Sequence, residues 1–235
     1  AINVYDEPLI ENIGRFIQRV QISGRYFINF ADAPAVVTSS APLVYHYGCR
    51  IGDADMQAMG AWAAKDQGLF EKGLGDSIGR QLPALFIARK VQNATAAQPL
   101  PRDVWMDGIQ VMVARDRAGS DQGFFVAAKG GHNDESHNHN DVGNVVLYRD
   151  GRPVLIDAGV EAYSSKTFSP DRYDIWTMQS GYHNLPTVNS VMQEPGKRFA
   201  ARDLSYAADD ASASLTLDIA DAYPQEAGLR TWRRT

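Results

Sequence analysis

The chain has 235 residues, of which 44% are hydrophobic and 10% aromatic, so it can bury a sizeable core as one or two domains. Its formal net charge is −5 and no run of Lys or Arg exceeds two residues, which disfavours nucleic acid as a partner. The single cysteine, Cys49, excludes an internal disulfide and a thiolate metal cluster, and no stretch is long and apolar enough to predict a membrane span.

Up to about residue 95, the sequence has the apolar periodicity of helices. Apolar residues recur at three-and-four spacing over 9–20, and Asp6 is the expected N-cap of that helix. Further helices are predicted from about 53 to 67 and from about 77 to 92. The sequence that follows, NATAAQPLPRD, contains two prolines and several small residues, which favour a linker.

After about residue 95, the pattern becomes strand-like. Short runs of β-branched and aromatic residues at 104–116 and 123–131 are interrupted by glycine and aspartate. The sequence NVVLYRDGRPVLIDAG, at 144–159, is the clearest strand signal. Helices followed by strands are typical of the α+β class, which we therefore predict.

The Asp150-Gly151 pair predicts a tight turn within the strongest strand signal. These two residues suit the central positions of a type I′ turn, so the strands on either side should form a hairpin. The register of a two-residue hairpin places Asn144 opposite Asp157 at the open end. The polar segment 136–141 enters at the same end, which brings it within reach of Asp157.

That polar segment, SHNHND, holds two histidines, His137 and His139, two positions apart. If the segment is extended, both imidazoles point to the same side, so one could bind a metal while the other faces a substrate. His139, Asp157 and a third imidazole would supply the ligands of a zinc site. His183, in SGYHNLPTVN, is the natural third ligand.

Two other interpretations compete with the metal site. His139 and His183 could instead be satisfied by hydrogen bonds to backbone and carboxylate groups in a polar core. A cupin-type site would pair the H-x-H motif with a glutamate a few residues later, but the residues after His139, NDVGNVVL, contain no glutamate. The sequence therefore disfavours the cupin. It leaves open both the metal site and the hydrogen-bonded polar core.

The segments ESHNHNDVGNVVLYRDGRPVLIDAGVEAY and FSPDRYDIWTMQSGYHNLPTVN combine an H-x-H-x-D motif, an Asp-x-Gly strand end and a Y-H-N element. Together they resemble the C-terminal portion of the heparinase II/III-like polysaccharide lyases, a group that also includes alginate lyases. The match covers 130–192. The resemblance implies that 1–95 form the C-terminal part of an (α/α) toroid, and that 96–235 form a truncated domain of antiparallel β-sheets stacked as a sandwich.

The resemblance also implies roles for the histidines. It assigns a structural zinc to His139, Asp157 and His183. The resemblance further implies that His137 faces the cleft between toroid and sheet, where it would be catalytic. The zinc would then brace the loop that aims His137.

A second group of expected site residues includes an Arg-Tyr pair. Arg172 and Tyr173 match a pair that contributes a cleft tyrosine in the alginate-cleaving relatives. By this resemblance Tyr173 is a second catalytic residue, and Asn138 and Arg172 contact the substrate.

Lyases of this family act on uronate-containing acidic polysaccharides, of the glycosaminoglycan or alginate type, by β-elimination. The C5 proton is removed, negative charge develops on the uronate carboxylate, and the C4–O bond to the next sugar breaks. Such chemistry needs a base, an acid and donors that stabilise the developing charge. The resemblance thus implies an acidic polysaccharide as partner and a periplasmic or secreted location, while the oligomeric state stays open.

One part of the family pattern is not found in this sequence. The family's catalytic Tyr, and the Asn or His that neutralises the carboxylate, lie on the toroid about 150 positions before the H-x-H motif, which falls before residue 1. Tyr45, His46 and Tyr47 do not have this spacing and are interpreted as half-buried aromatic residues at a helix end. We therefore expect an inactive fragment of a polysaccharide lyase. The alternative is a non-catalytic, zinc-stabilised β-domain that binds carbohydrate or acts as a scaffold.

Overall fold

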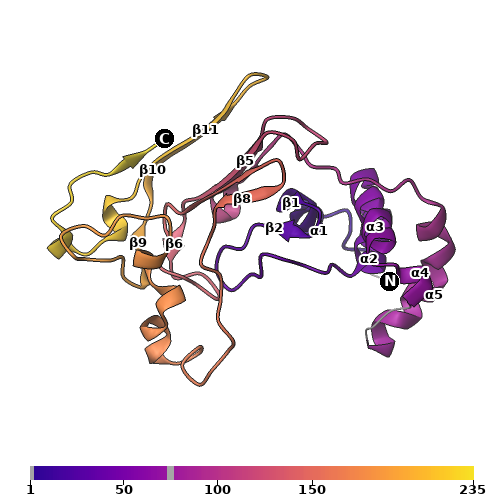
Figure 1. The fold of residues 1–235 in the computed structure, drawn as a ribbon, viewed down its shortest axis with the longest axis horizontal. Coiled ribbons are helices and arrows are strands. Elements are labelled where there is room, and N and C mark those ends of the chain that lie inside the picture. The colour runs from indigo at the N-terminus through magenta and orange to yellow at the C-terminus, as the bar shows by residue number, and fades with distance from the viewer. Residues whose placement is uncertain (1–2, 73–76) are drawn as a thin grey trace. The chain divides into compact units, whose positions relative to one another are not determined.

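The computed structural model describes residues 3–72 and 77–235, and Figure 1 shows their helices and strands in chain order. The chain divides into two compact units, which are described separately. The first consists of Ala1–Tyr26, Val36–Leu100 and Ala118–Ser120, and the second of Phe27–Ala35, Pro101–Arg117 and Asp121–Thr235. No helix among the described residues has the length and apolar character that crossing a membrane requires. The domain boundary expected between 95 and 96 stays a prediction.

The first unit is built mainly from helices. They are α1 (Pro8–Arg19), α2 (Ala41–Arg50), α3 (Ala54–Asp66), α4 (Leu69–Lys72) and α5 (Ile78–Asn93). The short strands β1 (Gln21–Ser23) and β2 (Tyr26–Phe27) pair after α1. The three predicted helices are confirmed as α1, α3 and α5, whereas α2 and α4 were not predicted. Packing of α2, α3 and α5 buries a core of Ala41, Tyr45, Ala63, Ala64 and Val91.

The start of α1 differs from the prediction. Its N-cap is Glu7 rather than Asp6, and Glu7 makes no capping hydrogen bond through its side chain. The Asp6 carboxylate instead accepts a hydrogen bond from Asn3 Nδ2, at 2.6 Å. In α3 the expected chemistry is present, because the Asp53 side chain accepts a hydrogen bond from the Met56 amide at 2.9 Å.

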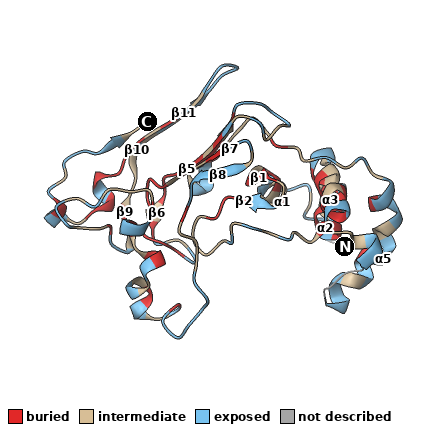
Figure 2. Ribbon diagram, in the orientation of Figure 1, coloured by how far each residue is buried: buried red, intermediate tan, exposed pale blue. Residues whose placement is uncertain are grey.

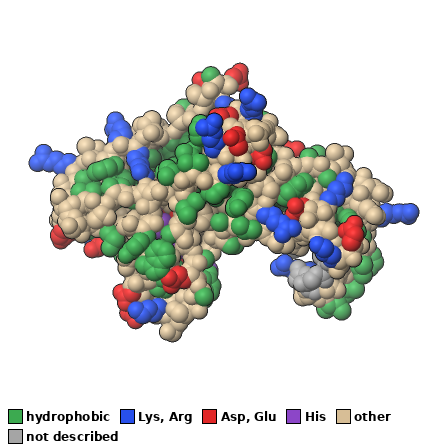
Figure 3. Space-filling model, viewed as in Figure 1, with side chains coloured by type: hydrophobic (Ala, Val, Ile, Leu, Met, Phe, Trp, Pro, Cys, Tyr) green, Lys and Arg blue, Asp and Glu red, His purple; other side chains and the backbone are tan. Residues whose placement is uncertain are grey.

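Part of the apolar pattern that predicts these helices lies on the surface. Leu9 and Ile13 of α1 are exposed, and Leu85 and Phe86 of α5 are 69% and 87% exposed. Figure 3 shows hydrophobic side chains gathered over α5 on the face in view. The apolar residues of α1 and α5 therefore do not all lie on a buried face of this structure, whereas Met56 and Met59 of α3 are buried.

The second unit contains antiparallel sheets. The five-stranded sheet has the order β3-β4-β5-β7-β8 and is formed by Asp103–Met106, Val111–Arg115, Phe124–Lys129, Val145–Arg149 and Arg152–Leu155. The three-stranded sheet has the order β10-β11-β12 and is formed by Arg202–Ala208, Ala213–Asp218 and Arg233–Arg234. A third, two-stranded sheet pairs β6 (His132–Asn133) with β9 (Gly196–Ala200).

The two larger sheets share a hydrophobic core. Met112 of β4 and Leu215 and Leu217 of β11 belong to one buried cluster. Trp105 of β3 stacks on Tyr206 of β10, with ring centroids 5.3 Å apart. Figure 2 shows the buried residues on β5 and β7 in red. The combination of helices and antiparallel sheets confirms the α+β class.

The hairpin predicted at Asp150-Gly151 is also confirmed. These residues have φ values of 50° and 71°, as a type I′ turn requires. The ladder shifts register before it reaches the open end, so the strict opposition of Asn144 and Asp157 is not observed. Their side chains nevertheless meet, because Asn144 Nδ2 donates a hydrogen bond to Asp157 Oδ2 at 2.5 Å.

Gly143, between the polar segment and β7, occupies a position that excludes a side chain. Its φ is +86°, and a Cβ atom there would lie 2.7 Å from Ile219 Cγ2. We expect Gly143→Ala to lower the free energy of unfolding by about 2–5 kcal/mol, from left-handed backbone strain and overpacking together. Gly228→Ala is the matched control: its φ is +67°, but its nearest atom lies at an ordinary 3.6 Å. Urea unfolding that shows equal losses for the two variants would contradict the packing explanation.

Asp218, at the end of β11, fixes the return of the chain into β12. Its buried carboxylate accepts hydrogen bonds from the amides of Ala220 and Trp232, at 2.8 and 2.9 Å, and from the Thr231 hydroxyl at 2.5 Å. Burial alone would raise the pKa of Asp218, but these hydrogen bonds and the charge of Arg202 outweigh it and hold the pKa well below its usual range. The ionised carboxylate therefore stabilises the folded state.

Replacing Asp218 with asparagine should lower the free energy of unfolding by about 2–4 kcal/mol at pH 7. Because the folded pKa is depressed, the stabilisation is fully present above the unfolded pKa of about 3.9 and declines as the pH falls below it. The difference between wild type and Asp218→Asn should therefore be smaller at pH 3 than at pH 7 in urea titrations. Asp210→Asn, which changes an exposed carboxylate in the turn between β10 and β11, is the control. An equal difference at the two pH values would refute this explanation.

Candidate metal centre

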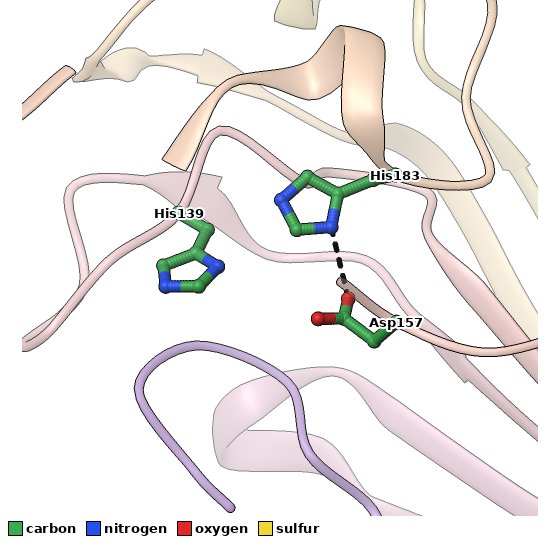
Figure 4. Close-up of side chains that lie close together, drawn as sticks. All are labelled: His139, Asp157 and His183. Carbon is green, nitrogen blue, oxygen red and sulfur yellow. Dashed lines mark hydrogen bonds and ion pairs between the residues drawn. The ribbon is translucent and has the colours of Figure 1, made fainter. Parts of the chain in front are cut away.

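Three loops of the second unit bring His139, Asp157 and His183 together. His139 lies between β6 and β7, Asp157 follows β8, and His183 follows the short 3-10 turn Ser180–Tyr182. All three side chains are buried, and one potential ligand atom from each lies within 4.8 Å of the others. Figure 4 shows the two imidazoles and the carboxylate turned toward a common gap. The structure therefore brings together the three residues that the sequence predicted as a metal site.

The hydrogen bonds of the two histidines leave one nitrogen of each ring available. His183 Nδ1 is bonded to Asp157 Oδ2 at 2.9 Å, and His139 Nε2 is bonded to Asp32 Oδ1 at 3.0 Å. Among the described residues, His139 Nδ1 and His183 Nε2 are buried and have no hydrogen-bond partner. Metal-binding histidines typically hold one nitrogen with a carboxylate and coordinate through the other. The orphaned nitrogens thus fit a metal better than a fully hydrogen-bonded polar core.

The charges around the site also suit a cation. The carboxylates of Asp32, Asp141 and Asp157 are buried around the site together with two cations, Lys129 and Arg172. Lys129 Nζ contacts Asp141 Oδ1 at 2.5 Å, and Arg172 Nη2 contacts Asp32 Oδ1 at 2.9 Å. With neutral imidazoles, one negative charge is left over, on the carboxylate of Asp157. A divalent ion would compensate it in a region where an unpaired charge is costly.

The two imidazoles differ in their proton affinity. Burial lowers the pKa of His139, which favours the neutral form that binds metals. Burial would also lower the pKa of His183, but the hydrogen bond and charge of Asp157 outweigh it and raise this pKa. A proton on His183 and a metal ion would therefore be alternative ways of meeting the charge of Asp157.

His137 does not point into the buried gap. Its φ is +58°, so the H-N-H stretch does not have the extended backbone that would point both imidazoles to the same side. Its side chain is 47% exposed, and Nδ1 lies 2.8 Å from Asp32 Oδ2. The rings of Tyr163 and Phe168 flank the imidazole, with centroid distances of 6.4 and 5.4 Å. His137 is thus anchored at one nitrogen and accessible from the surface.

The segment that carries His137 and His139 is held by three further residues: Arg172, Tyr173 and Asn138. Arg172 is buried and donates through Nε to the Asn138 carbonyl at 3.0 Å and through Nη1 to the Thr167 carbonyl at 2.8 Å. Asn138 is also buried, and its Nδ2 donates to the Tyr173 hydroxyl at 3.3 Å. These contacts hold the segment that carries His137. The catalytic role expected for Tyr173 and the substrate contacts expected for Asn138 and Arg172 stay predictions.

Asp32 is the site residue that sequence reasoning missed. It belongs to 27–35, a segment that lies within the helical part of the sequence but packs in the second unit. Burial alone would raise its pKa, but hydrogen bonds with His137, Arg172 and His139 outweigh it and lower the pKa. The carboxylate is therefore ionised at neutral pH. No spacing in FADAPA marks it, because its partners lie more than a hundred positions away.

Comparison with known proteins identifies the family. Residues 100–235 match the model of the heparinase II/III-like C-terminal family. The chain belongs to this family. This confirms the resemblance seen in the sequence motifs, and the matched region includes the candidate metal centre and His137. No curated protein matches the chain.

Solved structures share the fold of this heparinase II/III-like chain. A structure of the heparinase III BT4657 gene product is 14% identical, with a TM-score of 0.59 over 88% of this chain and 27% of that chain. The heparan sulfate lyase HepC of Pedobacter heparinus is 14% identical, with a TM-score of 0.57 over 89% of this chain and 28% of that chain. The chain thus spans between a quarter and a third of these proteins. At this identity the likeness shows the fold alone.

Proposed function

We propose that this chain is the C-terminal part of a polysaccharide lyase that cleaves uronate-containing acidic polysaccharide by β-elimination. The observation that carries the proposal is the accessible imidazole of His137, anchored beside the buried His139–Asp157–His183 cluster in a chain of the heparinase II/III-like family. One similar protein, HepC of Pedobacter heparinus, is named as a heparan sulfate lyase in two structures, which favours a glycosaminoglycan over alginate.

In this proposal His137 acts at the reacting sugar. A half-exposed imidazole can accept the C5 proton, and its position on a tight turn allows a uronate ring to approach. Tyr173, whose hydroxyl accepts a hydrogen bond from Asn138, would be the acid that protonates the leaving C4 oxygen. Asn138 and Arg172 would orient the substrate or the residues that touch it.

The cluster of His139, Asp157 and His183 would hold a structural zinc ion. Two imidazole nitrogens and a carboxylate oxygen are a ligand set that zinc accepts, and the buried position suits a structural role. The bound ion would tie the loops at 139, 157 and 183 to one another. Those loops carry or adjoin His137, so the ion would fix its position without taking part in the elimination.

The remaining catalytic groups would lie on a helical toroid to which the first unit belongs. Exposed apolar residues of α1 and α5, among them Leu9 and Phe86, support this assignment, because apolar helix faces normally pack against further protein. The chain also spans under a third of its solved relatives. The full-length lyase would act on its polysaccharide in the periplasm or outside the cell.

A non-catalytic, zinc-stabilised carbohydrate-binding β-domain is the second candidate. Trp176 and Tyr182 favour it, because their rings are half exposed and 5.2 Å apart between centroids. Exposed aromatic faces can stack on sugar rings without any reaction.

The test uses the full-length protein loaded with zinc. It is incubated with heparan sulfate, chondroitin sulfate, hyaluronan and alginate, and with starch as an uncharged control. β-Elimination creates a C4–C5 double bond conjugated to the uronate carboxylate, so near-ultraviolet absorbance should grow with an acidic substrate only. Binding of these polymers without growth in absorbance would reject the lyase and favour the binding domain.

A further inference from the structure

We propose that Asp32 is a positioning residue that joins the metal centre to His137. One carboxylate contacts both histidines of the H-N-H motif: Oδ1 lies 3.0 Å from His139 Nε2, and Oδ2 lies 2.8 Å from His137 Nδ1. The part of this inference that concerns His137 rests on the proposed function. The part that concerns His139 depends only on the candidate metal centre.

The carboxylate selects one tautomer of each imidazole. An ionised carboxylate only accepts hydrogen bonds, so the nitrogen that faces it must carry the proton. In His139 this places the proton on Nε2 and leaves the lone pair of Nδ1, the orphaned nitrogen, for a metal. In His137 it places the proton on Nδ1 and leaves the lone pair of Nε2 for a substrate proton. Asp32 therefore prepares both rings for their different tasks.

Asp32 is itself held rigidly. Its side chain is 5% exposed, and besides the two histidines it receives hydrogen bonds from Arg172 Nη2 at 2.9 Å and from the Tyr163 hydroxyl at 3.1 Å. Arg172 is in turn fixed by the carbonyls of Asn138 and Thr167. Four donors converge on two oxygens, so the carboxylate cannot rotate without breaking several charge-assisted hydrogen bonds.

The backbone of His137 shows why such an anchor is needed. A left-handed φ of +58° is unfavourable for a non-glycine residue, so other contacts must hold the turn. The imidazole is tied to distant segments by its hydrogen bond to Asp32, and the Tyr163 hydroxyl also contacts the same ring nitrogen, at 3.3 Å. Through Asp32, the position of His137 is coupled to the ring that would bind the metal.

Histidine-selective proton–nitrogen NMR on the zinc-loaded chain tests the tautomers directly. We expect the wild-type protein to carry the proton on Nδ1 of His137 and on Nε2 of His139. In Asp32→Asn the side-chain amide can no longer accept from both rings, so the His137 tautomer should become mixed. A wild-type spectrum with the proton on His137 Nε2 would overturn the proposal without any variant.

Zinc affinity supplies a second readout, measured by competition with a chromogenic chelator. Asp32→Asn should weaken zinc binding by about 10- to 100-fold, as loss of a carboxylate behind a metal-binding histidine typically does. Asp32→Glu, which keeps the charge, should recover part of the affinity and the His137 tautomer. Asp134→Asn changes an exposed carboxylate in the loop that carries His137 and His139. This variant should leave the zinc affinity and the His137 tautomer unchanged. Unaltered zinc affinity and tautomers in Asp32→Asn would refute the inference.

These readouts do not depend on lyase activity. If the full-length protein cleaves no polysaccharide but Asp32→Asn changes both zinc affinity and tautomers, the proposed function fails and the positioning role stands. If the wild-type protein is an active lyase, Asp32→Asn should lower kcat more than it raises KM, because a misplaced base impairs the chemical step more than binding. Equal activity of Asp32→Asn and wild type would contradict the link to His137.

Discussion

Replacing His137 with alanine is expected to lower kcat/KM of the full-length lyase by about 100- to 10,000-fold, the range typical for loss of a positioned general base. The ring is half exposed, and Nδ1 is anchored by Asp32, so removal of the imidazole takes away the nitrogen proposed to accept the C5 proton. The rate is followed as growth of near-ultraviolet absorbance on the best substrate.

Two further variants separate chemistry from folding. His137→Asn should be equally inactive, although asparagine tolerates the left-handed φ of +58° better than alanine does. His132→Ala, which removes a histidine of strand β6 from the same region, should retain activity. Zinc content should be unchanged in all three proteins, because neither histidine belongs to the metal cluster. Full activity in His137→Ala would exclude the catalytic assignment.

Removal of the metal is expected to lower Tm by about 8–16 °C. An ion present at a thousand times its Kd stabilises the folded state by about 4 kcal/mol, and each kcal/mol corresponds to about 2–4 °C for a chain of this size. The physical reason is local: without an ion, the charge of Asp157 and the unpartnered nitrogens of His139 and His183 remain buried. Thermal unfolding with and without a chelator, followed by addition of zinc, measures the effect.

The variants for this experiment are matched in residue type. His183→Ala should unfold at a lower temperature and should no longer respond to chelator or zinc. His46→Ala, in which an exposed histidine of α2 is removed, should respond as the wild type does. Absence of metal in elemental analysis, together with a Tm that ignores the chelator, would instead favour the hydrogen-bonded interpretation of the cluster.

Features encoded by neighbouring residues could be predicted from the sequence. The helices α1, α3 and α5 follow from apolar periodicity, and the hairpin follows from Asp150-Gly151, because both depend on local backbone preferences. The hairpin in turn brings Asp157 to the end of the sheet where His139 lies. His183 was the natural third ligand in the sequence, and the family resemblance implied the same three residues. The three residues of the candidate metal centre could therefore be predicted from the sequence.

The tertiary structure alone decided how that centre is surrounded. Asp32 meets His139 across 107 positions, and no periodicity or spacing in one sequence reports such a contact. The same holds for Arg172, whose guanidinium is buried against Asp32, and for the left-handed turn at His137. Turns and helices follow from interactions between neighbours along the chain. Contacts between distant segments depend on how the whole unit packs, because a buried charge without a partner is unfavourable.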